Sequence, residues 1–260
     1  MTLKTSLREH LFRIWYWYVN KADKNDEILF MNFGYHDQDR HITIDEKSET
    51  DKYSLQLYLH LMSSVDTESK DIVEIGCGRG GGLSYIARIF PVASALGIDL
   101  NNRAILFCNR HYKMKGLSFL KGDAQNLKLE KNSCDIVINV ESSHRYPNMN
   151  AFLKEVVRIL RLGGYFLFTD FRYDNEMEGL KKDLEESGLT VVKERNINHE
   201  VTAALALDDT RRRKLIYKLA PKFLHNLALN FAGAVGSDTY NNFASNKYVY
   251  FSYLFKKELN

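Results

Sequence analysis

The chain lacks an excess of charge of either sign and lacks a long apolar run. Its 36 Lys and Arg residues nearly balance 33 Asp and Glu residues, and the formal net charge of +3 at pH 7 is too small to indicate a nucleic-acid partner. The apolar stretch over residues 11–19 is interrupted by Arg13, is too short to cross a bilayer and is followed by no small-residue cleavage site. We therefore expect neither an exported nor a membrane-spanning protein, whereas transient contact with a membrane surface stays compatible with the sequence.

Cysteine is scarce as well. The chain has three cysteines, an odd number without CxxC spacing, which argues against a disulfide framework and favours the reducing cytoplasm. It has no internal repeat and no low-complexity segment, and we assign no metal site. Its 260 residues, 45% of them hydrophobic, are enough for one domain of ordinary core size, alone or with appendages. Nothing in the sequence indicates an oligomeric state.

Hydrophobic periodicity divides the chain into four segments. Residues 1–50 form an aromatic-rich preface, with a helix predicted over residues 3–20. Residues 51–200 alternate helices with short apolar strands, a pattern typical of an α/β domain with a doubly wound, mostly parallel sheet. Residues 201–240 form a helical insertion, and residues 241–260 contain the last strand.

Within these segments, apolar runs and helical periods define the individual elements. Strands are predicted over residues 72–75, 95–99, 118–121, 136–140, 165–169, 191–195 and 247–255. Helices are predicted over residues 54–64, 80–90, 101–115, 149–160 and 176–187. Open α/β sheets bind their ligands at the carboxyl ends of the strands, so these ends are where we expect functional residues.

The most informative segment follows the first predicted strand. Residues 71–80 read DIVEIGCGRG, so Glu74 at the end of the strand is followed by glycines at alternate positions, among them Gly76 and Gly78. A strand that runs into a glycine-rich turn and then a helix lets a ligand lie against the backbone. A second strand ends at Asp99, about twenty residues farther on, where a carboxylate can accept hydrogen bonds from two ribose hydroxyls. The segment therefore predicts a site for a nucleoside-like ligand.

Charge distinguishes between the nucleosides that could bind here. A dinucleotide or triphosphate needs backbone N–H groups and often a lysine, without a carboxylate nearby. Glu74 lies at the mouth of the turn, and no Gly-Lys-Ser/Thr follows it. S-adenosylmethionine carries a cationic sulfonium and an ammonium group, which an acidic residue favours. We therefore predict S-adenosylmethionine as the cofactor, against the alternatives of a dinucleotide site or a turn without a ligand.

Other strand ends add candidate cofactor contacts. After the third strand, the carboxylate of Asp123 and the backbone N–H next to it, at Ala124, can pair with the adenine amino group and ring nitrogen. This assignment rests on fold analogy, and an aspartate here is also common as a turn or N-cap residue. The remaining predicted contacts are Cys77, Leu100 and Asn139, which adjoin the ends of the first, second and fourth strands.

The loop after the fourth strand contains the candidate catalytic base. Residues 139–147 read NVESSHRYP and leave the sheet where the reactive methyl group of the cofactor is expected. Methylation of an alcohol requires removal of a weakly acidic proton, for which a neutral imidazole is the usual acceptor. We predict that His144 is this base, the alternative being a loop histidine bonded to backbone.

Three further residues are candidates around this base. Asp170, at the exit of the fifth strand, is expected to orient His144 or to accept the proton itself, unless it caps the following helix. Tyr146 lies in the same loop as His144 and is a candidate substrate contact. Tyr35, in the segment Phe33-Gly-Tyr35, is a second substrate candidate, although clustered aromatic residues more often belong to the core.

The insertion combines an apolar stripe with a basic cluster. Its apolar side chains recur at steps of four, at Leu215, Leu219, Phe223, Leu227 and Phe231. Pro221 is expected to bend or restart the helix. The stripe either packs a surface helix on the core or makes the insertion a lid over the strand ends. The basic run at residues 211–214 is expected to be a solvated helix face.

These motifs resemble the class I S-adenosylmethionine-dependent methyltransferases and, more narrowly, the phthiotriolone/phenolphthiotriolone dimycocerosate methyltransferases. The resemblance is carried by residues 74–82, 97–101, 122–124, 139–144, 146–147, 155–158, 160 and 163–166, with further matches at 25–28 and 219–224. It covers nearly the whole chain and implies a Rossmann-like methyltransferase fold whose seventh strand is antiparallel. The chain departs from the family pattern at Cys77, Arg79 and Arg145.

The resemblance also implies a reaction. Members of that family O-methylate a hydroxyl of a long, polyketide-derived lipid, so we expect an O-methyltransferase acting on a hydroxylated, apolar small molecule of polyketide-like or lipidic kind. One alternative is a C- or N-methyltransferase acting on a sterol-like or amine compound. Another is a protein that uses the fold for a non-methyl reaction such as cyclisation, or as a partner subunit. A base in the loop of His144 argues against the partner subunit.

Overall fold

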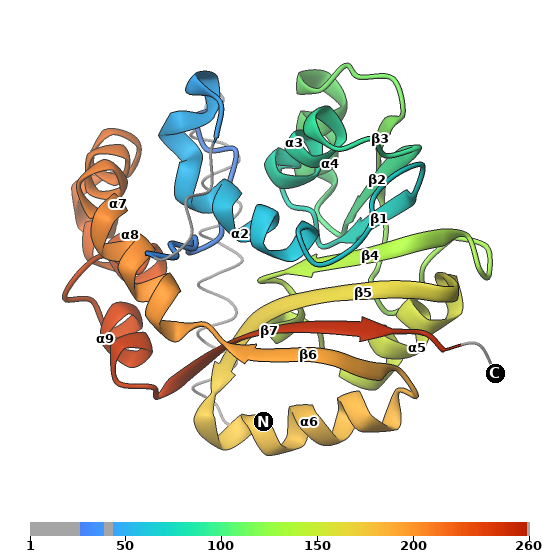
Figure 1. Cartoon of the computed structure of the whole chain (residues 1–260). Helices are drawn as coiled ribbons and strands as arrows, with labels where there is room; N and C mark the ends of the chain where they lie inside the picture. Colours follow the sequence, from blue (N-terminus) through green and yellow to red (C-terminus); the bar gives the residue numbers. More distant parts are fainter. Residues whose placement is uncertain (1–26, 39–43, 259–260) are drawn as a thin grey trace.

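A computed structural model describes residues 27–38 and 44–258, so the helix predicted over residues 3–20 lies outside the described residues. The strands are β1 (Asp71–Ile75), β2 (Ser94–Asp99), β3 (Leu117–Lys121), β4 (Cys134–Val140), β5 (Leu160–Tyr173), β6 (Thr190–Asn196) and β7 (Tyr248–Lys256). They form a seven-stranded sheet in the order β3-β2-β1-β4-β5-β7-β6 (Figure 1). Only β7 runs antiparallel to its neighbours. The predicted fold class is therefore confirmed.

Helices cover both faces of this sheet. They are α2 (Lys52–Met62), α3 (Gly81–Ile89), α4 (Asn102–His111), α5 (Met149–Ile159), α6 (Met177–Glu186), α7 (Asn198–Leu219), α8 (His225–Phe231) and α9 (Asp238–Ala244), with short 3₁₀ helices η1 (Glu46–Asp51), η2 (Ser143–Arg145), η3 (Asp174–Glu176) and η4 (Lys222–Leu224). In Figure 1, α3 and α4 lie on one side of the sheet and α5 and α6 on the other. The fold is thus a three-layer α/β sandwich, to which α7, α8 and α9 are added at one end.

The hydrophobic core has one layer on each face of the sheet. On the first face, side chains of α2, α3 and α4 such as Leu57, Leu83 and Ile105 pack together in one buried cluster. On the second face, Phe152 of α5 and Leu180 of α6 belong to another. The central strands β1 and β4 supply residues to both clusters, which explains why they are nearly continuous apolar runs in the sequence.

Strand β5 is much longer than the segment predicted over residues 165–169. It begins directly after α5 and continues to Tyr173. The extension follows from its pairing with β7, in which Tyr165 to Tyr173 face Lys256 to Tyr248 one by one. A partner strand so far along the chain leaves no local signal in the sequence of β5 itself.

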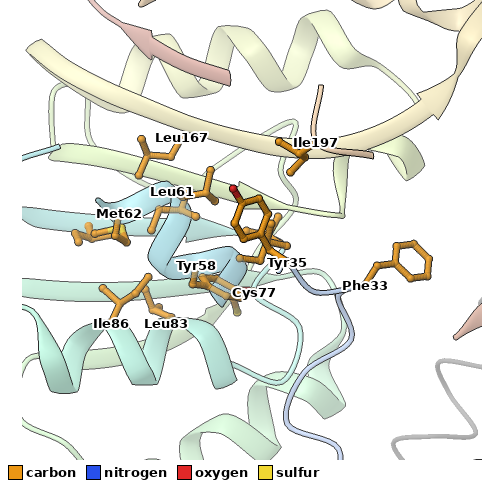
Figure 2. Close-up of a cluster of buried hydrophobic side chains, with 14 of the residues drawn as sticks. Phe33, Tyr35, Tyr58, Leu61, Met62, Cys77, Leu83, Ile86, Leu167 and Ile197 are labelled. Carbon is orange, nitrogen blue, oxygen red and sulfur yellow. The ribbon is translucent and has the colours of Figure 1, made fainter. Parts of the chain in front are cut away.

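The aromatic segment before α2 contributes Tyr35 to the core. Only 1% of Tyr35 is exposed, and its ring stacks on His60 with centroids 4.4 Å apart. Figure 2 shows this ring among the labelled side chains of Leu61 and Ile197, whereas Phe33 lies apart from them. Tyr35 therefore has no surface for a substrate in this structure, which corrects its assignment as a substrate contact.

The insertion contains a break where the sequence predicts one. Helix α7 ends at Leu219, and Pro221 has an extended backbone before η4 and α8 begin. The predicted stripe is not continuous across this break, because Phe223 is 84% exposed. Near the break, Ile216, Ala220 and Ala228 are buried instead and form a small cluster of their own.

The basic run in α7 is not simply a solvated face. Only 11% of the Arg212 side chain is exposed, and its guanidinium contacts Asp208 at 2.9 Å and donates to the carbonyl oxygen of Phe33 at 3.0 Å. Arg213 pairs with Asp209 at 2.7 Å. Arg212 therefore links α7 to the segment before α2 through these contacts. The prediction that the basic run is a solvated helix face is wrong for Arg212.

Among the helices that the structure describes, none is long and apolar enough to cross a membrane.

Candidate active site

The glycine-rich turn after β1 requires its glycines. Gly76, Gly78 and Gly80 all have positive φ, a backbone conformation that other residues adopt at a cost. The turn is also crowded, since a Cβ on Gly76 would lie 2.3 Å from the hydroxyl of Ser142. The backbone N–H of Gly76 donates to the carbonyl of Ile98 at 2.7 Å, which ties the turn to β2. The result is a bare stretch of backbone at the carboxyl end of β1.

Asp99 is bound to this turn from the end of β2. One carboxylate oxygen accepts the backbone N–H of Gly78 at 2.8 Å, and the other accepts that of Asn101 at 2.7 Å. Burial raises the pKa of Asp99, and these two backbone hydrogen bonds oppose the shift. Each oxygen keeps a further lone pair, so the carboxylate can still accept hydroxyl groups of a ligand. Leu100, which is mostly exposed, follows directly at the rim.

Glu74 is fully buried under the turn. Its Oε1 accepts a hydrogen bond from the hydroxyl of Tyr58 at 2.7 Å, while Oε2 has no partner among the described residues. Burial, with a smaller contribution from Asp99, raises the pKa of Glu74 to about 7. Hydrogen bonds from the hydroxyl of Tyr58 and the backbone N–H of Leu83 oppose this shift. The weakly satisfied buried oxygen is of the kind that a cationic ammonium group suits.

Asn139 completes the same corner from the end of β4. Its Nδ2 donates to the carbonyl of Ile75 at 2.8 Å and to the hydroxyl of Ser142 at 2.8 Å, and it lies 3.1 Å from the hydroxyl of Tyr146. Its Oδ1 is buried without a partner in the described part of the chain. Two unpartnered oxygens beside a bare glycine turn therefore fit a nucleoside ligand that carries hydrogen-bond donors, as S-adenosylmethionine does.

The remaining predicted cofactor residues lie near the ends of the strands. They differ in how far their side chains are exposed to solvent. Asp123 is exposed, and its Oδ1 accepts the backbone N–H of Gln125 at 2.9 Å, so it forms the turn that the sequence left as an alternative. Ala124 next to it is buried. Cys77 is buried as well, with its sulfur against Gly97, and burial raises the pKa of its thiol well above the usual value. Only its backbone is left to line the turn.

His144 and Asp170 are brought together across the ends of β4 and β5. His144 lies in η2, and its Nδ1 is 2.7 Å from Oδ1 of Asp170, while its backbone N–H donates to Oδ2 at 2.9 Å. Asp170 is fully buried and also accepts the hydroxyl of Ser143 at 2.6 Å. Arg172 pairs with it at 3.2 Å. This pair was predicted from the two strand exits alone.

The charges of this pair decide what each residue can do. Although burial opposes ionisation, His144 and Arg172 hold the pKa of Asp170 well below its usual range. An ionised carboxylate accepts hydrogen bonds only, so the proton between the two residues resides on Nδ1 of His144. Asp170 is therefore a poor proton acceptor, and of the two roles predicted for it the geometry favours the orientation of His144.

The second ring nitrogen of His144 is where a base would act. Burial lowers the pKa of His144 in spite of Asp170, so the ring is neutral near pH 7 and Nε2 has a lone pair. The Nε of Arg145, in the same loop, donates to this Nε2 at 3.1 Å. Arg145 must move away before an acceptor can approach the base from that side.

Two site residues escaped the sequence prediction. Glu141, in the loop of His144, has φ +45° and accepts hydrogen bonds from the hydroxyl of Tyr250 at 2.5 Å and the backbone N–H of Phe33 at 2.6 Å. Burial raises the pKa of Glu141 to about 8. An acidic residue directly after a buried strand was the available signal. Phe171 packs on His144 with centroids 4.6 Å apart, and the ring of Phe33 in turn packs against Phe171.

Comparison with known proteins points to methyltransferases. A family described as "Methyltransferase domain" matches residues 73–168. A phthiotriol/phenolphthiotriol dimycocerosates methyltransferase of Mycobacterium tuberculosis is 35% identical over 255 residues, which cover 98% of this chain and 94% of the relative. A fatty-acid O-methyltransferase of Mycolicibacterium smegmatis is 36% identical over 98% of this chain and 93% of its own length.

A solved structure shares the fold at much lower identity. The geranyl diphosphate C-methyltransferase of Streptomyces coelicolor, crystallised with S-adenosyl-L-homocysteine, superposes with a TM-score of 0.64 at 13% identity. The match covers 92% of this chain and 96% of that one. At this identity the likeness concerns the fold alone, and it extends over almost the whole length of both chains.

Proposed function

The chain belongs to the family of S-adenosylmethionine-dependent methyltransferases that includes the phthiotriol/phenolphthiotriol dimycocerosates methyltransferases, and on this premise we propose that it methylates a hydroxyl of an apolar, polyketide-like or lipidic molecule. The observation that carries the proposal is the contact of His144 with Asp170. A neutral imidazole held by an ionised carboxylate is the arrangement of a general base, and an alcohol needs one.

S-adenosylmethionine supplies an electrophilic methyl group when it is bound. The role of the protein is to make the acceptor oxygen nucleophilic. Nε2 of His144 does this by accepting the proton of the hydroxyl group. Asp170 stays ionised and stabilises the imidazolium that forms. Because both the ring and the backbone N–H of His144 bond to this carboxylate, the ring keeps one orientation throughout.

We propose that side chains at or just after the strand ends hold the cofactor. Ionised Glu74 and the carbonyl oxygen of the Asn139 side chain would accept the ammonium group, since both have buried oxygens without partners. Asp99 would accept the two ribose hydroxyls. The exposed Asp123 and the backbone of Ala124 would receive the adenine. The carboxylate of Glu74 would repel the phosphates of a nicotinamide dinucleotide.

Buried aromatic side chains pack behind the base. Phe33, Phe171 and Phe243 pack edge to face with centroids between 5.1 and 5.6 Å apart, and they come from the preface, β5 and α9. We propose that the preface and the insertion over residues 201–240 together enclose the acceptor. The three free, buried cysteines suit a reducing compartment, so we place the reaction in the cytoplasm.

A carboxyl acceptor is the second candidate, favoured by Arg145. This cation lies against Nε2 of His144, where it could bind an acidic acceptor bidentately. One relative named above is a fatty-acid O-methyltransferase. A carboxylate is already deprotonated at pH 7 and needs no base. The two candidates therefore differ in which residue is indispensable, His144 for a hydroxyl and Arg145 for a carboxyl.

In the test, the purified protein is incubated with S-adenosylmethionine and either a long-chain alcohol or the matching fatty acid. For a hydroxyl acceptor, we expect turnover of the alcohol that falls in His144→Gln and is kept in Arg145→Gln. Methylation of the acid alone, lost in Arg145→Gln and kept in His144→Gln, would establish the second candidate instead. A product whose new methyl group is bonded to carbon or nitrogen in its NMR spectrum would refute both.

A further inference from the structure

The junction of α7 with η4 exposes aromatic side chains beside lysines. Phe223 is 84% exposed and Tyr217 is 51% exposed. Lys214, Lys218 and Lys222 are exposed on the same stretch of chain. We call these five residues the basic aromatic corner. Large aromatic side chains at such exposure are costly in water and commonly mark a surface that binds something.

The corner lies where α7 meets η4 and α8. Residues 214, 217 and 218 are three and four positions apart on α7 and so lie on one face of the helix. The ring of Tyr217 lies 4.9 Å from that of His225 at the start of α8, which places η4, with Phe223, next to the end of α7. In Figure 1 the α7 and α8 region projects on the side of the molecule away from α3 and α4.

The corner carries an uncompensated positive charge. The sequence has no Asp or Glu between Asp209 and Asp238. The arginines that precede the corner are paired with Asp51, Asp208 and Asp209. Lys218 pairs with Glu27 at 2.7 Å. Within the described residues no ion pair involves Lys214 or Lys222, so their charges are available to an outside partner.

We propose that the basic aromatic corner docks on the surface of an anionic lipid bilayer. Aromatic side chains flanked by lysines suit the boundary between head groups and acyl chains, because the ring enters the apolar side while the ammonium groups meet anionic head groups. Phe223 is the inserted side chain, and Lys214 and Lys222 supply the electrostatic attraction. With one strongly exposed ring and two available lysines, docking is weak and reversible. It would bring the enzyme to acceptors that reside in the membrane.

The test measures sedimentation of the full-length protein with vesicles, without any turnover. We expect binding to phosphatidylcholine vesicles that contain phosphatidylglycerol, and much less to phosphatidylcholine alone. Lys214→Ala and Lys222→Ala should each weaken binding about fivefold, and added salt should weaken it further. Phe223→Ser should weaken it about tenfold.

Matched controls are available on other helices. Leu106 on α4 is 60% exposed and Lys182 on α6 is exposed, so Leu106→Ser and Lys182→Ala remove a similar side chain elsewhere and should leave vesicle binding unchanged. Equal losses in corner and control variants, or no binding to anionic vesicles, would overturn the proposal. So would a dimer that Phe223→Ser converts to a monomer, since the corner would then be an interface between two copies. Failure of the methylation test leaves this result unaffected.

Discussion

His144 and the carboxylate of Asp170 are joined twice, through Nδ1 of the ring at 2.7 Å and through the backbone N–H at 2.9 Å. The second contact fixes the loop and the first fixes the ring within it. Asp170 comes from β5, while His144 follows β4, so the pairing of these two strands sets the distance. A base built in this way keeps its orientation without help from the acceptor.

If this pair acts as proposed, His144→Ala should lower turnover about a hundredfold or more, while the affinity for S-adenosylmethionine changes little. Some turnover should remain, because bringing the two reactants together contributes independently of the base. His199→Ala, which removes an exposed histidine of α7, is the control and should retain full turnover. Near-normal turnover of His144→Ala, measured beside calorimetric titration of the cofactor, would remove His144 from the reaction.

The activity should also rise with pH. Only the neutral ring accepts a proton, and burial lowers the pKa of His144, so the rate at saturating S-adenosylmethionine should increase with pH through a midpoint below that of a free imidazole. Asp170→Asn removes the charge that opposes this shift and should move the midpoint lower still, together with a fall in turnover. A pH–rate profile with the same midpoint in both proteins would show that Asp170 does not act through His144.

The glycine turn allows a matched comparison of stability. Gly76 and Gly163 both have φ +77°, but a Cβ on Gly76 would meet Ser142 whereas one on Gly163 would meet nothing within 4 Å. Gly163→Ala should therefore cost only the backbone strain, about 1–2 kcal/mol in the free energy of unfolding. Gly76→Ala should cost clearly more in urea unfolding and should weaken cofactor binding. Equal costs would mean that the contact with Ser142 relaxes freely.

Local signals in the sequence were sufficient for the centre of the fold and much of the site. The spacing of Glu74, Gly76 and Gly78 and the acidic end of β2 at Asp99 are short-range patterns, and the structure places all of them around one turn. Pro221 likewise acts on its own neighbours, and the helix ends before it. Such features depend on backbone chemistry that each residue type carries with it.

The features that were missed depend on partners far along the chain. The position of Phe33 beside Phe171 depends on the hydrogen bond between Phe33 and Glu141, which are 108 positions apart. The burial of Arg212 follows from the packing of α7 against that same segment. Periodicity describes one helix at a time, so it continued the apolar stripe through Phe223, where the break at the proline exposes it.

Binding of the ribose can be tested at Asp99. Asp99→Ala should weaken S-adenosylmethionine by about 1.5–3 kcal/mol, the scale of hydrogen bonds to a charged group. Asp99 also accepts a hydrogen bond from the backbone N–H of Asn101, which the substitution removes. The control is Asp66→Ala, because Asp66 accepts the same kind of hydrogen bond from the backbone N–H of Glu68. This variant should bind the cofactor normally. Unchanged affinity of folded Asp99→Ala in calorimetry would place the ribose elsewhere.

Glu74 should make cofactor binding depend on pH. Its pKa is raised to about 7 by burial, so near neutral pH the free protein holds this carboxyl about half protonated. An ammonium group favours the ionised form, and the affinity for S-adenosylmethionine should therefore increase as the pH rises through about 7, with release of protons on binding below that pH.

Calorimetry in two buffers with different ionisation enthalpies measures these protons directly. Glu74→Gln should abolish both the proton release and the rise in affinity, and its affinity should fall below that of the unaltered protein mainly at pH 8. Methylthioadenosine lacks the amino-acid part of the cofactor, so its binding should be nearly independent of pH in both proteins. If instead methylthioadenosine shows the same pH dependence as S-adenosylmethionine, the proton is linked to the nucleoside, and the ammonium group does not lie against Glu74.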